Sequence, residues 1–67
     1  MKLHEAIIII LSDSGRKMTT REIADELNKR KLYRKKDGSI ITDYQVHGRT
    51  KNYPKLFKRD GSMVSLV

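Results

Sequence analysis

The stretch that decides the fold is residues 42–57, which read TDYQVHGRTKNYPKLF. Its first four residues match a capping box, in which the Thr42 hydroxyl and the Gln45 side chain bond otherwise free backbone amides at the start of a helix. Pro54 cannot continue a helix and disfavours helical backbone in the residue before it. A helix is therefore predicted over about residues 43–52, followed by a segment of different structure.

This predicted helix has two faces of different chemistry. At about 100° per residue, Val46, Thr50 and Tyr53 share one side and are expected to face the core. The outward residues include no carboxylate and are Tyr44, Gln45, His47, Gly48, Lys51, Asn52 and Lys55. Amides and an imidazole suit base edges, and lysines suit phosphates. The outward face is therefore typical of a helix that enters the major groove of DNA.

Three positions of the helix leave alternatives open. Gly48 costs a helix roughly 1 kcal/mol relative to alanine. It either allows close approach to a groove wall or marks a weak helix or tight packing against a neighbour. His47 is a candidate base contact or an ordinary solvated histidine. Arg49 lies beside the core-facing residues, where it either bridges to a carboxylate or reaches a phosphate from the rim.

Two further helices are predicted upstream. The first covers about residues 2–14 and ends where Gly15 supplies a left-handed stop. After a short extended stretch at Met18, residues 19–22 form a second capping box that opens a helix over residues 20–30. The apolar positions that share a face are Leu3, Ala6, Ile7, Ile10 and Leu11 in the first helix, and Ile23, Ala24 and Leu27 in the second.

Downstream, the sequence predicts a β-hairpin. Residues 56–58 and 63–67 flank residues 59–62, with Asp60-Gly61 at the turn and Lys58 and Arg59 at the tip. The predicted class is thus α+β, in one domain over residues 1–67, with three helices, a short strand after the first helix and a C-terminal hairpin. This is the element order of a winged helix-turn-helix.

The charge is unevenly distributed along the chain. The net charge is +7, yet residues 1–28 carry four basic and five acidic side chains, whereas residues 29–67 carry eleven and three. Residues 29–36 alone contain six cations, including Arg34, Lys35 and Lys36. Leu32 and Tyr33 are expected to pack this segment against the rest of the domain while its cations stay solvated. A positive charge concentrated in one half of the chain is typical of a protein that binds a polyanion.

Other classes of function are poorly supported. A chain of 67 residues has little material for a buried catalytic site, and no nucleophile–base pair or phosphate-binding glycine loop is visible. There is no cysteine, and the two histidines lack ligand spacing, so neither a metal nor a cofactor is expected. The apolar run at residues 7–11 is too short to span a bilayer. A cytoplasmic, nucleoid-associated protein with no small-molecule substrate is expected.

The chain resembles the HARE-type helix-turn-helix family, a group of winged-helix modules. These modules occur in bacterial restriction endonucleases, in the delta subunit of bacterial RNA polymerase and in chromatin proteins of the Additional-sex-combs-like group. The resemblance covers nearly the whole chain and is closest to the endonuclease-associated branch. It rests on residues 18–24 (MTTREIA), 32–33 (LY), 36–38 (KDG), 45–46 (QV), 52–57 (NYPKLF) and the hairpin. Thr50 departs from the pattern, because the family has an aliphatic residue at this core-facing position.

The resemblance implies a DNA-binding adaptor in transcription regulation or restriction-modification, usually attached to a larger protein and, in some proposals, sensing modified bases. Double-stranded DNA is thus the expected partner, contacted by the third helix, residues 29–36 and residues 58–62. One alternative is a protein-interaction module, in which Ile8 or Ile9, lying off the apolar face of the first helix, contacts a partner. The other alternative is structured RNA.

Overall fold

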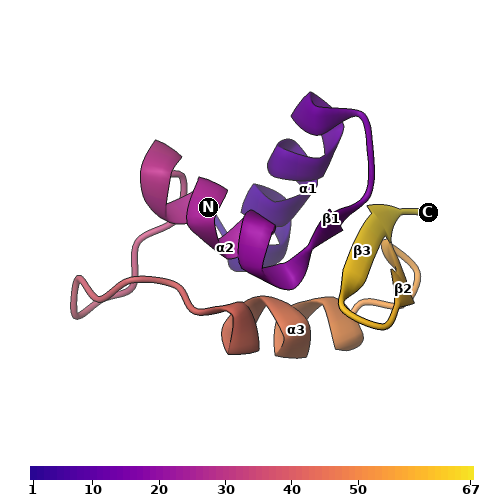
Figure 1. The fold of residues 1–67 in the computed structure, drawn as a ribbon. Coiled ribbons are helices and arrows are strands. Elements are labelled where there is room, and N and C mark those ends of the chain that lie inside the picture. Colours follow the sequence, from indigo (N-terminus) through magenta and orange to yellow (C-terminus); the bar gives the residue numbers. More distant parts are fainter.

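The computed structural model describes all 67 residues, and it has three helices and a three-stranded antiparallel sheet. The order along the chain is α1 (Leu3–Ser14), β1 (Met18–Thr19), α2 (Thr20–Arg30), α3 (Asp43–Lys51), β2 (Phe57–Asp60) and β3 (Met63–Leu66). The three helices pack together, and the sheet, with strand order β1-β3-β2, lies at one end of them (Figure 1). The α+β class, the three helices and the short strand after the first helix are confirmed.

Both predicted capping boxes are present. At the start of α2, the Glu22 amide donates to the Thr19 hydroxyl at 3.0 Å and the Thr19 amide donates to the Glu22 carboxylate at 2.9 Å. At the start of α3, Thr42 and Gln45 make the corresponding bonds, at 3.3 and 2.9 Å. These local bonds explain why α2 begins at the predicted residue and α3 begins at Asp43.

The core draws on every element of the chain. Thirteen buried apolar residues form one cluster, and the predicted apolar faces of α1 and α2 all belong to it. Val46 and Thr50 are fully buried, and Tyr53 is half-buried against the cluster, as expected for the inner face of α3. The Thr50 hydroxyl donates to the carbonyl oxygens of Val46 and His47, at 2.9 and 3.1 Å. A threonine is therefore accommodated here because its hydroxyl is satisfied within the helix.

The hairpin differs from its prediction by a shift in register. Asp60 pairs with Met63, so the turn consists of Gly61 and Ser62, not of Asp60 and Gly61. Only Gly61 of these two takes a positive φ, of 62°, which is the sign pattern of a type II′ turn with glycine first. The predicted place of Lys58 and Arg59 at the tip is consequently wrong, because both lie within β2.

The two isoleucines off the apolar face of α1 are both half-buried. Ile8 packs against the core cluster, and Ile9 is likewise less exposed than the large apolar residues that lie open to solvent. Of the two interpretations of these residues, a first helix covered on most sides describes the structure better.

Acidification below pH 4.5 is expected to destabilise the fold through its capping carboxylates. The Lys2 amide lowers the pKa of Glu5, and the Thr19 amide lowers that of Glu22, from an ordinary value of 4.5. A carboxylate with a lowered pKa in the folded state contributes stability above its ordinary pKa, and this contribution is lost as pH falls through the folded value. The free energy of unfolding in urea should therefore drop between pH 5 and pH 3.

The variant Glu22→Gln isolates one of these contributions, because glutamine can still accept the capping bond but does not titrate. Its stability should fall less steeply with acid than that of the natural chain. Asp25→Asn is the matched control, since the Asp25 carboxylate lies on the same helix and accepts no hydrogen bond. Equal acid sensitivity in the two variants would contradict the assignment.

Candidate nucleic-acid interface

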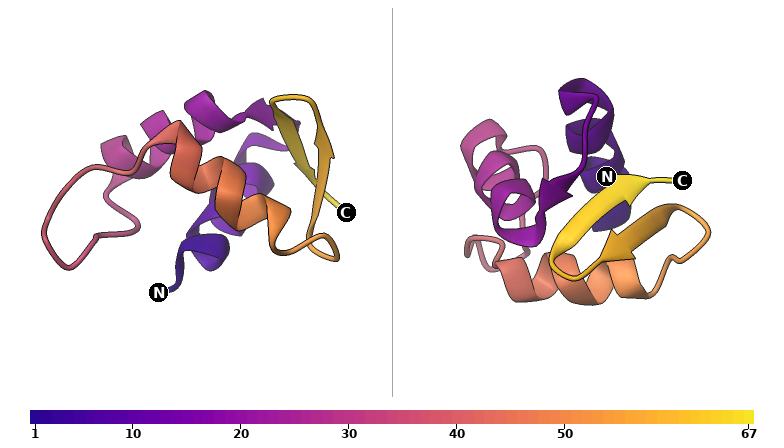
Figure 2. Two further views of the ribbon diagram at one scale, coloured as in Figure 1. Left: turned by 90° about the horizontal axis from the view of Figure 1, so that it is seen from below. Right: turned by 45° about the vertical axis from the view of Figure 1, so that its right-hand side comes forward.

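The outward face of α3 is open to solvent along its length. Tyr44 is 85% exposed, and His47, Gly48, Lys51 and Asn52 are exposed as well. Gln45 is half-buried, and its side-chain oxygen is engaged in the helix cap, so its amide N–H groups are what it can offer to a ligand. Seen from below, α3 crosses the foreground, the 31–42 loop extends from its start, and the hairpin lies toward its other end (Figure 2).

Gly48 is not explained by packing within the protein. A Cβ atom built at this position would meet no atom within 4 Å. Tight packing against a neighbouring element is therefore excluded as the reason for this glycine. Close approach of an external surface to the helix backbone, or a weak helix, stays open.

Lys55 does not lie on the helix. The helix ends at Lys51, and residues 54–56 form a turn before β2, so a helical angle does not apply to Lys55. Its side chain is nevertheless exposed beside the end of α3. The last turn tightens, since the Asn52 amide is shared between the carbonyl groups of Gly48 and Arg49, and the helix cannot continue because Pro54 has no amide N–H to donate.

The cations of α3 and β2 have no carboxylate partners. The three ion pairs of the structure all involve carboxylates of the first 26 residues, with Arg16 or Arg30 as the cation. Residues 44–59 hold five basic side chains and no acidic one, and none of the five forms an ion pair, Arg49 included. Their charge is thus available to an external anion.

Arg30 is one of the six cations of residues 29–36, but it is paired with carboxylates of the protein itself. Its guanidinium donates to Asp13 at 2.6 Å and to Glu26 at 3.3 Å, so it joins α2 to α1. The bond to Asp13 is the first cause of the raised pKa of Arg30. Arg30 is consequently a structural residue, whereas Arg34 and Lys36 are exposed and Lys35 is half-buried.

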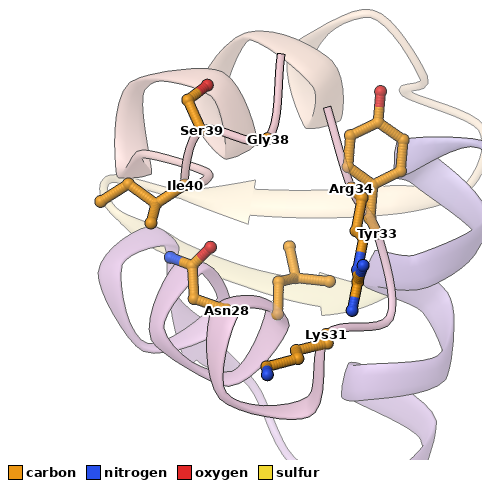
Figure 3. A pocket seen from close by; sticks show the side chains of 8 residues that line it. Asn28, Lys31, Tyr33, Arg34, Gly38, Ser39 and Ile40 are labelled. Atoms are coloured by element: carbon orange, nitrogen blue, oxygen red, sulfur yellow. The ribbon is translucent and has the colours of Figure 1, made fainter. Parts of the chain in front are cut away.

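The loop between α2 and α3 is anchored at both ends. Leu32 and Tyr33 pack against the core cluster, as predicted. At the other end, the Asn28 side-chain Nδ2 donates to the Ile41 carbonyl and the Ile41 backbone amide donates to Asn28 Oδ1, both at 2.8 Å. Between these anchors a hollow of about 280 Å³ lies against the end of α2, and Lys31 and Arg34 are among the residues that line it (Figure 3). Sequence reasoning missed the Asn28 contact, since it joins residues 13 positions apart.

Two of the predicted DNA contacts touch each other. Along β2, burial alternates, so Lys58 is exposed while Arg59 turns inward and is half-buried. The Arg59 guanidinium Nη2 lies 2.7 Å from Nδ1 and 2.8 Å from Nε2 of His47 on α3. The Nε of Arg59 is buried with no hydrogen-bond partner, which costs about 1–3 kcal/mol for such a donor.

The second histidine has a packing role. The His4 ring stacks on Tyr53, with the centroids 4.2 Å apart and the planes at 22°, and so joins the start of α1 to the end of α3. Neither histidine belongs to a group of three or more side chains that could hold a metal ion. The contact was not predicted, because it pairs residues far apart in the sequence.

No helix has the length and apolar character needed to cross a membrane. No protein-family model matches the sequence, and no curated protein or solved structure is significantly similar to it. The resemblance to the HARE-type family therefore rests on the sequence motifs alone and stays a prediction.

Proposed function

We propose that the chain is a winged helix-turn-helix module that binds duplex DNA and is not an enzyme. In this proposal α3 is the recognition helix and the β2–β3 hairpin is the wing. The observation that carries the proposal is the outer face of α3 beyond its first residue, Asp43: it is exposed, holds no carboxylate and is supplied with cations that have no carboxylate partner within the protein. A surface of this kind attracts the phosphate backbone, and its polar side chains meet base edges.

The other cations extend this surface at both ends of α3. Lys58 is exposed on β2 beside one end, and Arg34 and Lys36 are exposed in the loop that leads to the other end. Contacts of this type to phosphates fix the orientation of a helix in the groove without reading sequence. We expect the flanking cations to contribute affinity and the residues of α3 to contribute selectivity.

The alternatives have weaker support. A protein-interaction module would need an open apolar surface on α1, but Ile8 and Ile9 are both half-buried. Double-stranded RNA has a major groove too narrow for side chains to read, so an exposed helix gains little there. Sensing of modified bases follows only from the family resemblance, and attachment to a larger protein follows from that resemblance and from the weak binding expected of one outward helix of this size.

The decisive experiment is an NMR titration of the labelled chain with a duplex at about 50 and about 200 mM salt. Shifts should centre on Tyr44–Lys51 and on Lys58 and Arg59. With about five phosphate contacts, the affinity should fall several-hundred-fold between the two salt concentrations, from a slope of about −0.9 per contact. Absence of any shift at low salt would refute DNA binding, and shifts at Ile8 and Ile9 that depend only on protein concentration would favour self-association.

The variant Gly48→Ala separates the remaining interpretations of this glycine. Because an added Cβ meets no atom within 4 Å, alanine should stabilise α3 by roughly 1 kcal/mol. If the backbone of α3 approaches a groove wall at this point, the same methyl group should weaken DNA binding. Thermal unfolding and fluorescence anisotropy measure the two effects. A stabilised variant with unchanged affinity would show that Gly48 is a weak point of the helix and no contact.

A further inference from the structure

The inward turn of Arg59 follows from the register of the hairpin. Arg59 pairs with Val64, which is fully buried, and directly paired residues of antiparallel strands point to the same face of the sheet. Phe57, two residues before Arg59, is buried on the same face. The Arg59 side chain is therefore directed toward α3, where its guanidinium meets His47.

In this contact an N–H of the Arg59 guanidinium is directed at the imidazole ring of His47. Nη2 of Arg59 is nearly equidistant from the two ring nitrogens of His47, at 2.7 and 2.8 Å. An atom in the ring plane at these distances from both nitrogens would collide with the carbon between them, so Nη2 lies over the ring face. One N–H of Nη2 is thus used on His47 and Nε is buried, so the N–H groups left for a ligand are the second of Nη2 and the two of Nη1.

The contact also holds the guanidinium in place before any ligand binds. An arginine side chain has many rotamers, and fixing them costs entropy at the moment of binding. Here the stem of Arg59 is half-buried between α3 and the sheet, its Nε is buried without a partner, and its end rests on the ring. Two carboxylates are near in sequence or space, Asp60 beside Arg59 and Asp43 in the same hollow as His47, but neither forms an ion pair with Arg59.

We propose that His47 is a positioning residue, whose ring holds the Arg59 guanidinium ready to donate a bidentate pair of hydrogen bonds to one phosphate of the duplex. The proposal rests on the DNA-binding function proposed above. The proposal assigns a phosphate contact to Arg59, and it removes His47 from the residues expected to contact bases. Paired N–H groups in a fixed fork match the geometry of phosphate oxygens.

The test is a double-mutant cycle of His47→Ala and Arg59→Ala, measured by fluorescence anisotropy on one duplex at one fixed pH. Each single variant should lose roughly tenfold in affinity, and the double variant should lose no more than either. Each should also lower the salt slope by about 0.9, the value for one phosphate. A merely structural role for His47 would leave that slope unchanged.

The variant His47→Phe provides the rescue, because a phenyl ring can carry the guanidinium but cannot hydrogen-bond a base. It should bind within about threefold of the natural chain. If His47 instead contacts the duplex itself, phenylalanine will fail as alanine does and the losses in the cycle will add, which would overturn the proposal.

Two controls distinguish the failure of this inference from the failure of DNA binding. Lys51→Gln should weaken binding independently of His47. If the natural chain binds and Lys51→Gln weakens binding, but the losses of His47→Ala and Arg59→Ala add, only the positioning role is refuted. A natural chain that does not bind at low salt refutes both.

In the DNA-free protein, the Arg59 side-chain protons should show a ring-current shift that disappears in His47→Ala and persists in His47→Phe. Absence of that shift in the natural chain would also overturn the proposal.

Discussion

Replacement of Phe57 by alanine is expected to leave a large fraction of the molecules, on the order of half, unfolded at 25 °C. Phe57 is only 3% exposed and opens β2, where it joins the hairpin to the helical core. Truncation of a buried phenylalanine costs about 3–5 kcal/mol. A core in a chain of this length supplies about 3–5 kcal/mol of net stability, so the loss consumes nearly all of it. Urea titration followed by circular dichroism should show a transition that is already advanced without denaturant.

The neighbouring residue provides the control. Leu56 is 37% exposed, so Leu56→Ala removes a side chain of similar apolar character that is only partly packed, and it should cost less than about 1 kcal/mol. Phe57→Leu should lie between the two, because it retains apolar volume at the same site. If Phe57→Ala and Leu56→Ala were equally stable, the hairpin would not be packed on the helices through Phe57.

Reversal of the charge at Lys51 should produce the largest loss of DNA affinity among single substitutions. Lys51 is exposed in the last turn of α3 and has no carboxylate partner. Lys51→Glu removes one phosphate contact and places a negative charge against the phosphate backbone. The two effects together should weaken binding on the order of 100-fold at 50 mM salt, with a smaller loss at higher salt. Fluorescence anisotropy on a fixed duplex measures it.

Lys17→Glu is the matched control, since it makes the same change in net charge elsewhere. Lys17 is exposed in the connection between α1 and β1, which lies on the side of the molecule away from α3 (Figure 1). Only long-range attraction is altered there, so affinity should change by less than about threefold. Equal losses in the two variants would mean that net charge, and not the face of α3, determines binding.

The predictable part of this protein is the part that depends on neighbours in sequence. The capping boxes at residues 19–22 and 42–45 set the starts of two helices, and the helical repeat selected Ile23, Leu27 and Val46 for the core, as the structure has them. Each of these features is settled within four or five residues. Periodicity and capping chemistry therefore suffice to predict them.

Periodicity failed where the backbone stops repeating. The helical repeat puts Lys55 on the outward face although α3 ends at Lys51, and the sequence predicts the hairpin turn one residue too early. In the hairpin a shift of one residue exchanges the two faces of a strand. Because successive residues of a strand point to opposite faces, Lys58 and Arg59 have different surroundings, and the register decides that Arg59 is the one against α3.

By itself, then, the sequence determined three helices, their inner faces and a basic second half with an outward surface free of carboxylates on α3. Only the tertiary structure decided which of those cations are free, because ion pairing joins elements distant in sequence, as Arg30 with Asp13 does. It also decided that Arg59 rests on His47, since the strand register and the packing of the sheet on α3 bring them together. Contacts of this kind depend on the arrangement of whole elements, and no local pattern of residues encodes them.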